Sequence, residues 1–246
     1  MLMDCIATGS TGNCYILAAG QDKLILDCGV RYKDIQAALG FDASCVAGCL
    51  VTHEHNDHSK ALPDLMRAGI GCYMTKGTAE AKGASGHRLR IVAAGEVFGV
   101  GQFVVSPFET QHDAAEPVGY LVHHAPTGES LLYATDTFYL RYAFKNVHYV
   151  LVECNYCRDT AYDRYQSGEM DKALYDRLMS SHMSLENLKG FLSACDLSAT
   201  RRIVLLHMSE GNADEARMLR EVRELAGIEV DAAIGGTRLE LELCPF

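Results

Sequence analysis

The sequence has no long hydrophobic run. Its apolar stretches all fall short of the ~20 residues that a transmembrane helix needs, and Met1–Cys5 is not a basic segment that leads into an apolar one. Internal repeats and low-complexity tracts are absent as well. We therefore expect no membrane segment and no signal peptide. With 48% apolar and 22% charged residues, the composition is typical of a soluble globular protein.

The sequence also lacks an excess of positive charge. Its 22 Lys and Arg are outnumbered by 32 Asp and Glu, which gives a net charge of −10. This charge argues against broad, non-specific adhesion to nucleic acid or to anionic membranes. It does not exclude a phosphodiester substrate, because bound metal cations can reverse the local sign of the charge.

The ten cysteines do not form a disulfide framework. They are scattered along the chain, and several, such as Cys14, Cys28 and Cys49, lie inside apolar runs. This pattern predicts reduced, buried thiols and a cytoplasmic protein. Cys154 and Cys157 form one isolated C-x-x-C. A zinc ribbon would need a second pair, so metal binding or redox work there is the less favoured interpretation.

Short apolar runs alternate with helix signals along the chain, without a long linker. This alternation predicts one α/β domain over residues 1–246. The expected strands are Cys14–Ala18, Lys23–Asp27, Val46–Thr52, Gly71–Met74, Phe103–Phe108, Gly119–His123, Ser130–Thr135, Val147–Glu153, Arg202–His207, Glu229–Ala233 and Thr237–Leu243. The expected helices are Tyr32–Leu39, Ser59–Ala68, Leu185–Ala194 capped by Ser184, and one that Asn212 caps and Gly227 ends. Arg158–His182 is polar and predicts a surface excursion with a short helix and a loop.

The stretch from Thr52 to His58, T-H-E-H-N-D-H, is the most informative part of the chain. It places His53, His55, Asp57 and His58 directly after an apolar run. Imidazole and carboxylate together suit borderline divalent metals such as zinc, manganese or iron. A polar turn with solvated histidines is the alternative, but so dense a pattern seldom arises by chance.

Three further candidate ligands stand where predicted strands end: His112, Asp136 and His207. Strand ends of an α/β scaffold converge on one rim, which is where such folds place their sites. Each residue alone is more simply read as a loop residue. Taken in order behind the first motif, the set predicts a metal site.

The order His-x-His-x-Asp-His, then His, then Asp, then His resembles the metallo-β-lactamase fold superfamily. The resemblance implies a four-layer αββα sandwich with two divalent metal ions at one edge. One metal would be held by His53, His55 and His112, and the other by Asp57, His58 and His207, with Asp136 bridging the two. Asp27 matches the strand-end aspartate that supports the ligands from behind.

Other segments resemble the YycJ/WalJ group, whose characterised members are regarded as DNA exonucleases. They include the opening T-G-S-T-G-N-C-Y at Thr8–Tyr15 and the A-T-D-T at Ala134–Thr137. S-H-M-S at Ser181–Ser184 stands where this group, tRNase Z and the PhnP-type phosphodiesterases carry a histidine. The resemblance implies that His182 is a proton donor steadied by Glu153. A hydroxide bridging the metals would attack phosphorus, and Asp57 would be both a ligand and the group that orients it.

Substrate recognition is expected to involve Asn155, Arg158 and Arg164, and tyrosines such as Tyr156 could stack on bases. The segment between His112 and Asp136 is too short for the tRNA-gripping arm of tRNase Z. No long insertion follows Asp136 either, so the cap of RNA-cleaving relatives is absent.

Several functions stay open at this point. A nuclease-type phosphodiesterase leads, and a small or cyclic nucleotide phosphodiesterase follows, since the net charge fits it. Thioester or lactam hydrolysis is less favoured because it needs no acid like His182. A metal-stabilised binding module without catalysis is the remaining class. A homo-oligomer is neither implied nor excluded.

Overall fold

The computed structural model describes residues 1–241, which fall into two compact units. The first unit comprises Met1–Glu109, Ala114–Ser130 and the segment from Ile234 onward, and the second comprises Thr110–Asp113 and Leu131–Ala233. The end of the expected strand Thr237–Leu243 lies outside the described residues, and its described part is a strand from Thr237 to Glu240. One domain over residues 1–246 therefore stays a prediction.

The first unit is built on a seven-stranded mixed sheet in the order β14-β1-β2-β3-β4-β5-β6. Strands β14 to β3 pair antiparallel, and strands β3 to β6 pair parallel. The strands are β1 (Leu2–Ala7), β2 (Cys14–Ala19), β3 (Asp22–Leu26), β4 (Val46–Leu50), β5 (Cys72–Met74), β6 (Leu89–Ile91) and β14 (Thr237–Glu240). Parallel strands place their carboxyl ends at the same edge, so the residues after β3 and β4 meet there.

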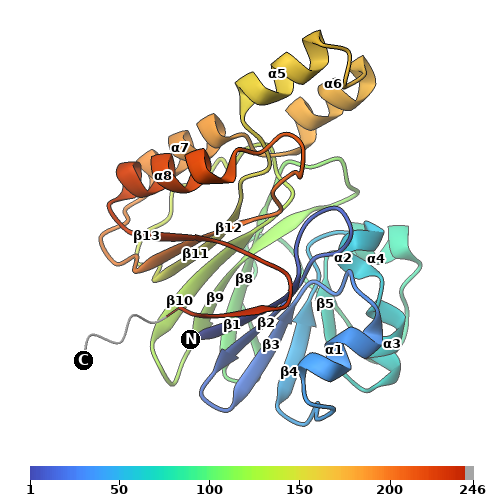
Figure 1. Ribbon diagram of the computed structural model, residues 1–246. Coiled ribbons are helices and arrows are strands. Elements are labelled where there is room, and N and C mark those ends of the chain that lie inside the picture. Colours follow the sequence, from blue (N-terminus) through green and yellow to red (C-terminus); the bar gives the residue numbers. More distant parts are fainter. Residues whose placement is uncertain (242–246) are drawn as a thin grey trace. The chain divides into compact units, whose positions relative to one another are not determined.

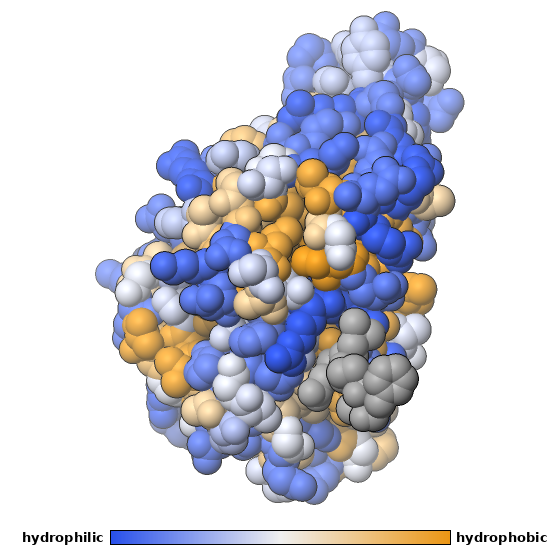
Figure 2. All heavy atoms as spheres, turned by 90° about the vertical axis from the view of Figure 1, so that its left-hand side faces the viewer, coloured by the Kyte–Doolittle hydropathy of each residue, from blue (hydrophilic) through white to orange (hydrophobic). Residues whose placement is uncertain are grey.

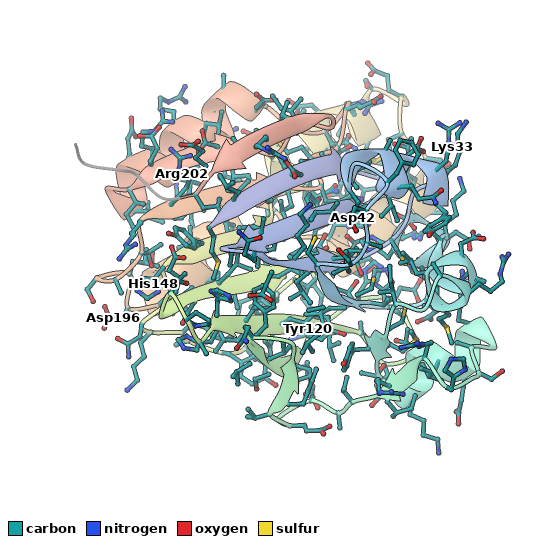
Figure 3. The ribbon with its side chains drawn as sticks, turned by 90° about the horizontal axis from the view of Figure 1, so that it is seen from below. Lys33, Asp42, Tyr120, His148, Asp196 and Arg202 are labelled. Atoms are coloured by element: carbon teal, nitrogen blue, oxygen red, sulfur yellow. The ribbon has the colours of Figure 1, made fainter. Side chains whose placement is uncertain are left out.

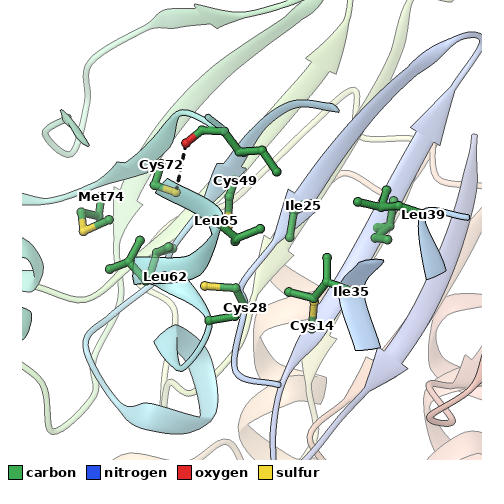
Figure 4. Packing of buried hydrophobic residues seen from close by; sticks show 14 of the residues in the cluster. Cys14, Ile25, Cys28, Ile35, Leu39, Cys49, Leu62, Leu65, Cys72 and Met74 are labelled. Atoms are coloured by element: carbon green, nitrogen blue, oxygen red, sulfur yellow. Dashed lines mark hydrogen bonds between the residues drawn. The ribbon is translucent and has the colours of Figure 1, made fainter. Parts of the chain in front are cut away.

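Helices cover one face of this sheet. Alternate strand residues such as Cys14, Ile25 and Cys49 pack with Ile35 and Leu65 from the helices in one buried cluster (Figure 4). Four buried cysteines belong to this cluster, Cys14, Cys28, Cys49 and Cys72, and each fills it as a small hydrophobic side chain. The helices of the first unit are α1 (Tyr32–Ala38), α2 (Asn56–Ser59), α3 (Leu62–Arg67) and α4 (Lys76–Lys82).

A second layer of strands packs within the first unit on the sheet's other face. These strands are β7 (Phe98–Val100), β8 (Phe103–Glu109) and β9 (Val118–His124), paired antiparallel. Phe98 stacks on Tyr73 with ring centroids 5.3 Å apart. Tyr120, labelled in Figure 3, donates its hydroxyl hydrogen to the Val51 carbonyl at 2.6 Å. The period of two along each strand thus separates a helix-facing side from a strand-facing side.

The second unit is built on parallel strands in the order β13-β12-β11-β10. Its strands are β10 (Glu129–Ala134), β11 (Tyr149–Glu153), β12 (Arg202–Leu206) and β13 (Glu229–Ala232). Its helices are α5 (Arg158–Gln166), α6 (Lys172–Ser181), α7 (Leu185–Ala194) and α8 (Glu215–Ala226). Figure 1 shows α7 and α8 side by side along these strands and α5 paired with α6. Every residue of β11 is buried, as expected for a parallel strand covered on both faces.

The structure corrects several boundaries. The expected helix Ser59–Ala68 is two helices, α2 and α3, with Pro63 in the first turn of α3, where it costs no hydrogen bond. Asn212 does not cap α8; the Asp214 side chain does, accepting from the Arg217 backbone. Arg158–His182 is not mainly loop, because α5 and α6 occupy most of it.

No helix in the described part of the chain is long and apolar enough to cross a membrane. Hydrophilic residues predominate on the face drawn in Figure 2, and hydrophobic residues gather in limited patches among them. Nine cysteines fall in the described residues, and seven of them are buried, including Cys14, Cys28 and Cys49. Their burial agrees with the prediction from the apolar runs.

Candidate metal centre

In the first unit, the candidate site begins with a buried carboxylate at the end of β3. Asp27 is fully buried and accepts hydrogen bonds from the Thr52 backbone N–H at 2.8 Å and from the Thr52 hydroxyl at 3.0 Å. It also accepts from His58 Nδ1 at 2.8 Å. Asp27 adopts a φ of +56°, a conformation that costs about 1–3 kcal/mol for a residue other than glycine. The surrounding hydrogen bonds hold it there.

The bond to Asp27 fixes the tautomer of His58. A carboxylate can only accept, so Nδ1 carries the hydrogen and Nε2 carries the lone pair. That Nε2 atom lies 3.0 Å from the Asn13 side-chain nitrogen and 3.6 Å from an Asp57 carboxylate oxygen. The ring is fully buried, so its orientation is set by packing as well as by hydrogen bonding.

Two more imidazoles lie beside His58 in the same unit. The His53 ring lies 4.2 Å from the His58 ring and 4.7 Å from the His55 ring, between centroids. The Thr52 hydroxyl lies 3.0 Å from His53 Nδ1. The loop thus gathers all three imidazoles of the motif.

The loop that carries these side chains is held by close backbone contacts. The Asn13 N–H donates to the Asp57 carbonyl at 2.6 Å. A Cβ added at Gly29 would stand 1.6 Å from the same carbonyl oxygen, an overlap that no side chain could accept. Gly29 therefore permits the close approach of the segment after β3 to α2.

In the second unit, candidate ligands stand at the ends of three neighbouring strands. Asp136 follows β10, Glu153 ends β11 and His207 follows β12. His207 Nδ1 lies 3.2 Å from an Asp136 oxygen and 3.1 Å from a Glu153 oxygen. With His182, these residues offer ligand atoms that all lie within 4.8 Å of one another. Asp136 and His207 also have positive φ angles, +46° and +54°, as Asp27 does.

His112 joins this group in the second unit. Its Nδ1 donates to the Ser181 carbonyl at 2.9 Å, which leaves the lone pair on Nε2. That Nε2 atom lies 3.8 Å from an Asp136 oxygen. Burial lowers the pKa of His112, against the opposing attraction of Asp136, and so favours the neutral ring that can bind a metal.

His182 makes a short contact with Glu153 in this group. Its Nδ1 lies 2.6 Å from a Glu153 oxygen. The other Glu153 oxygen accepts from the backbone N–H groups of Thr137 at 2.8 Å and Met183 at 3.1 Å. Burial acts to lower the pKa of His182, but the Glu153 carboxylate outweighs burial and raises it to about 9. Burial acts to raise the pKa of Glu153, and the His182 charge outweighs it, so that pKa is lowered.

The donor set fits divalent metal ions. His58, His112 and His207 each direct Nδ1 at an oxygen acceptor. The lone pair of each ring therefore lies on Nε2, which is the atom that would bind a metal. Oxygen partners on the far nitrogen are the usual arrangement behind metal-bound histidines. Imidazole and carboxylate donors without thiolate suit zinc, manganese or iron.

Comparisons with known proteins decide the family. Residues 25–208, more than half of the chain, match the family model described as a beta-lactamase superfamily domain. The chain belongs to the metallo-β-lactamase fold superfamily. It is an α/β hydrolase of that fold, with two mixed sheets flanked by helices, as the motif order predicted.

Individual members of the superfamily match over nearly the whole chain. Exodeoxyribonuclease YycJ of Bacillus anthracis is 29% identical, covering 93% of this chain and 91% of its own length. Exodeoxyribonuclease WalJ of Streptococcus pneumoniae strain D39 is 27% identical over 94% of this chain and 89% of its own. The crystal structure of the metallo-beta-lactamase fold protein YhfI from Bacillus subtilis matches with a TM-score of 0.73 at 15% identity, covering 97% of this chain and 98% of that one. The resemblance to the YycJ/WalJ group is thereby confirmed.

The residues expected to bind substrate have partners inside the second unit. The Asn155 amide donates to the His207 carbonyl at 2.7 Å and so supports the turn that presents His207. Arg158 donates to Asn187 at 2.6 Å, and Arg164 donates to Asn212 at 2.9 Å. These contacts hold the arginines against the fold, and their role in substrate binding stays a prediction.

Two sequence interpretations are settled by burial. Tyr156 cannot stack on a base, because only 1% of it is exposed and it packs with Ala161, Met170 and Leu178. Cys154 and Cys157 are buried, and burial raises the pKa of both thiols. Among the described residues, no cysteine belongs to a group that could hold a metal ion. The C-x-x-C is part of the packing.

Some residues at the site were not expected from the sequence. Asn13 and Thr52 support His58 and Asp27, and Thr137 and Ser181 support Glu153 and His112. Asn13 lies within Thr8–Tyr15, a segment whose sequence points only to the YycJ/WalJ group and not to a contact with His58. Thr137 and Ser181 act through backbone groups, which carry no signal in residue type.

Proposed function

We propose that this chain is a two-metal phosphodiesterase of the nuclease type that hydrolyses DNA. The pairing of His182 with Glu153 in the unit that also carries Asp136 and His207 is the observation that carries the proposal. Phosphodiester cleavage releases a sugar alkoxide that needs a proton, and a histidine steadied by a carboxylate is suited to supply it. Two similar proteins are named exodeoxyribonucleases, which supports DNA as the substrate.

The proposed metal shells follow the family pattern. One would consist of His53, His55 and His112, and the other of Asp57, His58 and His207, with Asp136 bridging them and Asp27 behind His58. Divalent ions bound there would provide a hydroxide near neutral pH and offset charge on the phosphoryl oxygens. Zinc, manganese and iron all suit these donors, and availability often decides among them.

The chain's own groups would manage the proton. With its pKa raised to about 9, His182 carries a proton at neutral pH and can donate it from Nε2 to the leaving oxygen. Glu153 holds Nδ1, and the Thr137 and Met183 N–H groups hold Glu153, so the ring is oriented before substrate binds. Asp57 would orient the attacking water.

Leaving groups of different basicity test the role of His182. We expect His182→Ala to lower kcat/KM on a DNA oligomer by about 10²–10⁴-fold, the usual contribution of a general acid. With the p-nitrophenyl ester of thymidine 5′-phosphate the loss should be much smaller, since p-nitrophenolate leaves without a proton. Elemental analysis should find the metal content unchanged. An equal loss on both substrates, or no loss on DNA, would contradict the acid role.

Small or cyclic nucleotides are the second candidate substrates, because the net charge of −10 suits a small ligand better than a long polyanion. Assaying linear DNA beside cyclic mononucleotides separates the two. Preferential cleavage of a cyclic mononucleotide would replace DNA as the substrate and leave the residue roles intact. Hydrolysis of a thioester or lactam in place of both would overturn the phosphodiester proposal. A DNA substrate agrees with the cytoplasmic location expected from the cysteines, which stays a prediction.

A further inference from the structure

A cavity of about 540 Å³ opens beside His112 in the second unit. Its size falls within the roughly 300–1,000 Å³ of typical small-ligand sites. Three segments line it: the 111–113 loop, the turn after Asp136 and the last turns of α6. The lining residues are Gln111, His112, Asp113, Phe138, Arg177, Ser180 and Ser181. One of them, His112, is a proposed metal ligand, so the cavity borders the candidate site.

Hydrogen bonds between the three segments fix the shape of the cavity. The Gln111 N–H donates to the Thr137 hydroxyl at 2.9 Å, and the Phe138 N–H donates to the Gln111 carbonyl at 3.0 Å. The Asn187 amide donates to the Phe138 carbonyl at 2.7 Å. The bond from His112 to Ser181 ties the loop to the end of α6. A cavity with walls held in this way is formed before a ligand enters, which lowers the entropic cost of binding.

Arg177 supplies the positive charge of the cavity. Within the described residues its guanidinium makes no ion pair and no side-chain hydrogen bond, and the side chain is exposed. The other arginines of this segment, Arg158 and Arg164, are already held by partners in the fold. The charge of Arg177 is close enough to His182 to act on its pKa, opposing the stronger effect of Glu153. An available guanidinium beside a proposed proton donor is well placed for a second anionic group of the substrate.

The remaining lining residues indicate what accompanies that anion. Phe138 offers a partly buried aromatic ring, on which a base or sugar can pack. Asp113 carries a negative charge and would repel a second phosphate on its own side of the cavity. Arg177, Phe138 and Asp113 thus supply one positive charge, one aromatic ring and one negative charge. This combination matches a single nucleotide better than a continuous stretch of phosphodiester backbone.

We propose that this cavity binds the nucleotide adjoining the scissile phosphodiester, with Arg177 holding the phosphate of that nucleotide and Phe138 contacting its base or sugar. The inference rests on the proposed phosphodiesterase function and extends it to the recognition of a second phosphate. Arg177 is thus a specificity-determining residue, which favours substrates carrying a phosphate beside the one that is cleaved.

Dinucleotides test the inference. Thymidylyl-thymidine has one phosphodiester and no second phosphate, whereas its 5′- and 3′-phosphorylated forms each add one. We expect the wild-type protein to hydrolyse one phosphorylated form with a kcat/KM about tenfold above that of the plain dinucleotide, the effect of one charge-assisted contact. Arg177→Met should bring that ratio close to one, and Arg177→Lys should keep part of it. The ratio is insensitive to changes at His182, because both substrates depend on the same acid.

Arg220→Met is the matched control, since Arg220 is an exposed arginine of the same unit that lines a different hollow. It should keep the wild-type ratio, and unfolding midpoints should show that all variants fold. A second readout needs no metal. In chelator-treated protein, Arg177→Met should reduce the salt dependence of oligothymidylate binding by about 0.7 in the slope of log K against log salt, one phosphate contact.

The possible outcomes separate the two proposals. A wild-type preference that survives Arg177→Met, or no preference at all, overturns the inference and leaves the phosphodiesterase function standing. If the wild-type protein hydrolyses neither the dinucleotides nor bis-p-nitrophenyl phosphate with metal supplied, the proposed function fails and the inference fails with it.

Discussion

The candidate ligands fall into two halves, one in each unit, and the two are built in contrasting ways. In the first unit, four candidate ligands lie within six residues, and Asp27 fixes the innermost of them from behind. In the second unit, His112, Asp136 and His207 come from segments far apart in the chain, and the proposed proton donor His182 and an open cavity stand beside them. The first half provides candidate metal ligands, among them Asp57, which would also orient the attacking water. The second half provides donors together with the groups that would meet the substrate.

This contrast assigns different work to two buried carboxylates. Asp27 contacts His58 and the Thr52 groups, which belong to the segment that presents the ligands of the first unit. Glu153 contacts both His182 and His207, and therefore serves the proposed acid as well as a proposed ligand. Substitutions of Asp27 and Glu153 should then differ in whether added metal restores the activity of the variant.

Loss of a ligand from either half should have the largest effect. We expect His53→Ala and His207→Ala each to bind less metal and to lose activity by about a thousandfold or more, since metal ions supply several kcal/mol of charge stabilisation. Elemental analysis and phosphodiesterase assays before and after chelation measure both quantities. Full activity in either variant at normal metal content would remove that residue from the ligand set.

Glu153→Gln should have the next largest effect and lower kcat/KM by about 10²-fold or more, because His182 loses the charge that keeps it protonated and oriented. Excess zinc or manganese should not restore this activity, since most of the defect lies in proton transfer. Titrating metal into the variant provides the measurement. Full rescue by metal would mean that Glu153 serves His207 alone.

Asp27→Asn should behave in the opposite way. The amide keeps the shape of the side chain but weakens the hold on His58 Nδ1, and such outer contacts are worth about 10–100-fold in metal affinity. Activity should be low at limiting metal and return close to the wild-type value at saturating metal. If saturating metal leaves the defect in place, the distinction between the two carboxylates is wrong.

The smallest effect concerns stability against pH. The pKa of His182 rises from 6.5 to about 9 on folding. A raised pKa stabilises the fold fully below pH 6.5, and this contribution is lost as pH rises through about 9. In chelator-treated protein, the Tm difference between the wild type and His182→Gln should therefore be a few °C at most, largest below pH 6.5, and absent above pH 9. A difference that grows with pH would contradict the pairing with Glu153.

Sequence patterns were sufficient for the regular parts of the fold. Each predicted strand has a counterpart in the described residues, because buried strands consist of short continuous runs of apolar residues. Three short elements were not predicted: β6 and β7 have only three residues each, and α4 has few apolar residues. The longer strand β1 was not predicted either, because no turn signal precedes it. The helices α5 and α6 could not be predicted from apolar periodicity, because most of their side chains are polar and only a few are buried.

The candidate site also has a part that the sequence predicts and a part that it does not. Ligands could be proposed from type and spacing, since imidazole and carboxylate groups after strands are unusual. The Thr137 N–H and the Ser181 carbonyl could not be proposed, because every residue supplies a backbone carbonyl and every residue except proline supplies a backbone N–H. The cavity was equally hidden, since its three walls meet only after folding.

The end of α6 limits where residues could be inserted into this chain or deleted from it. Ser181 closes the helix and holds His112 through its carbonyl, and the very next residue is His182. Removing one residue inside α6 would rotate everything beyond it by about 100° relative to the preceding turns. The proposed acid and the support of a proposed ligand would then leave register together, along with Arg177 if the deletion precedes it. Length variation in this segment should therefore be confined to the turn between α5 and α6, where Gly168 lies outside both helices.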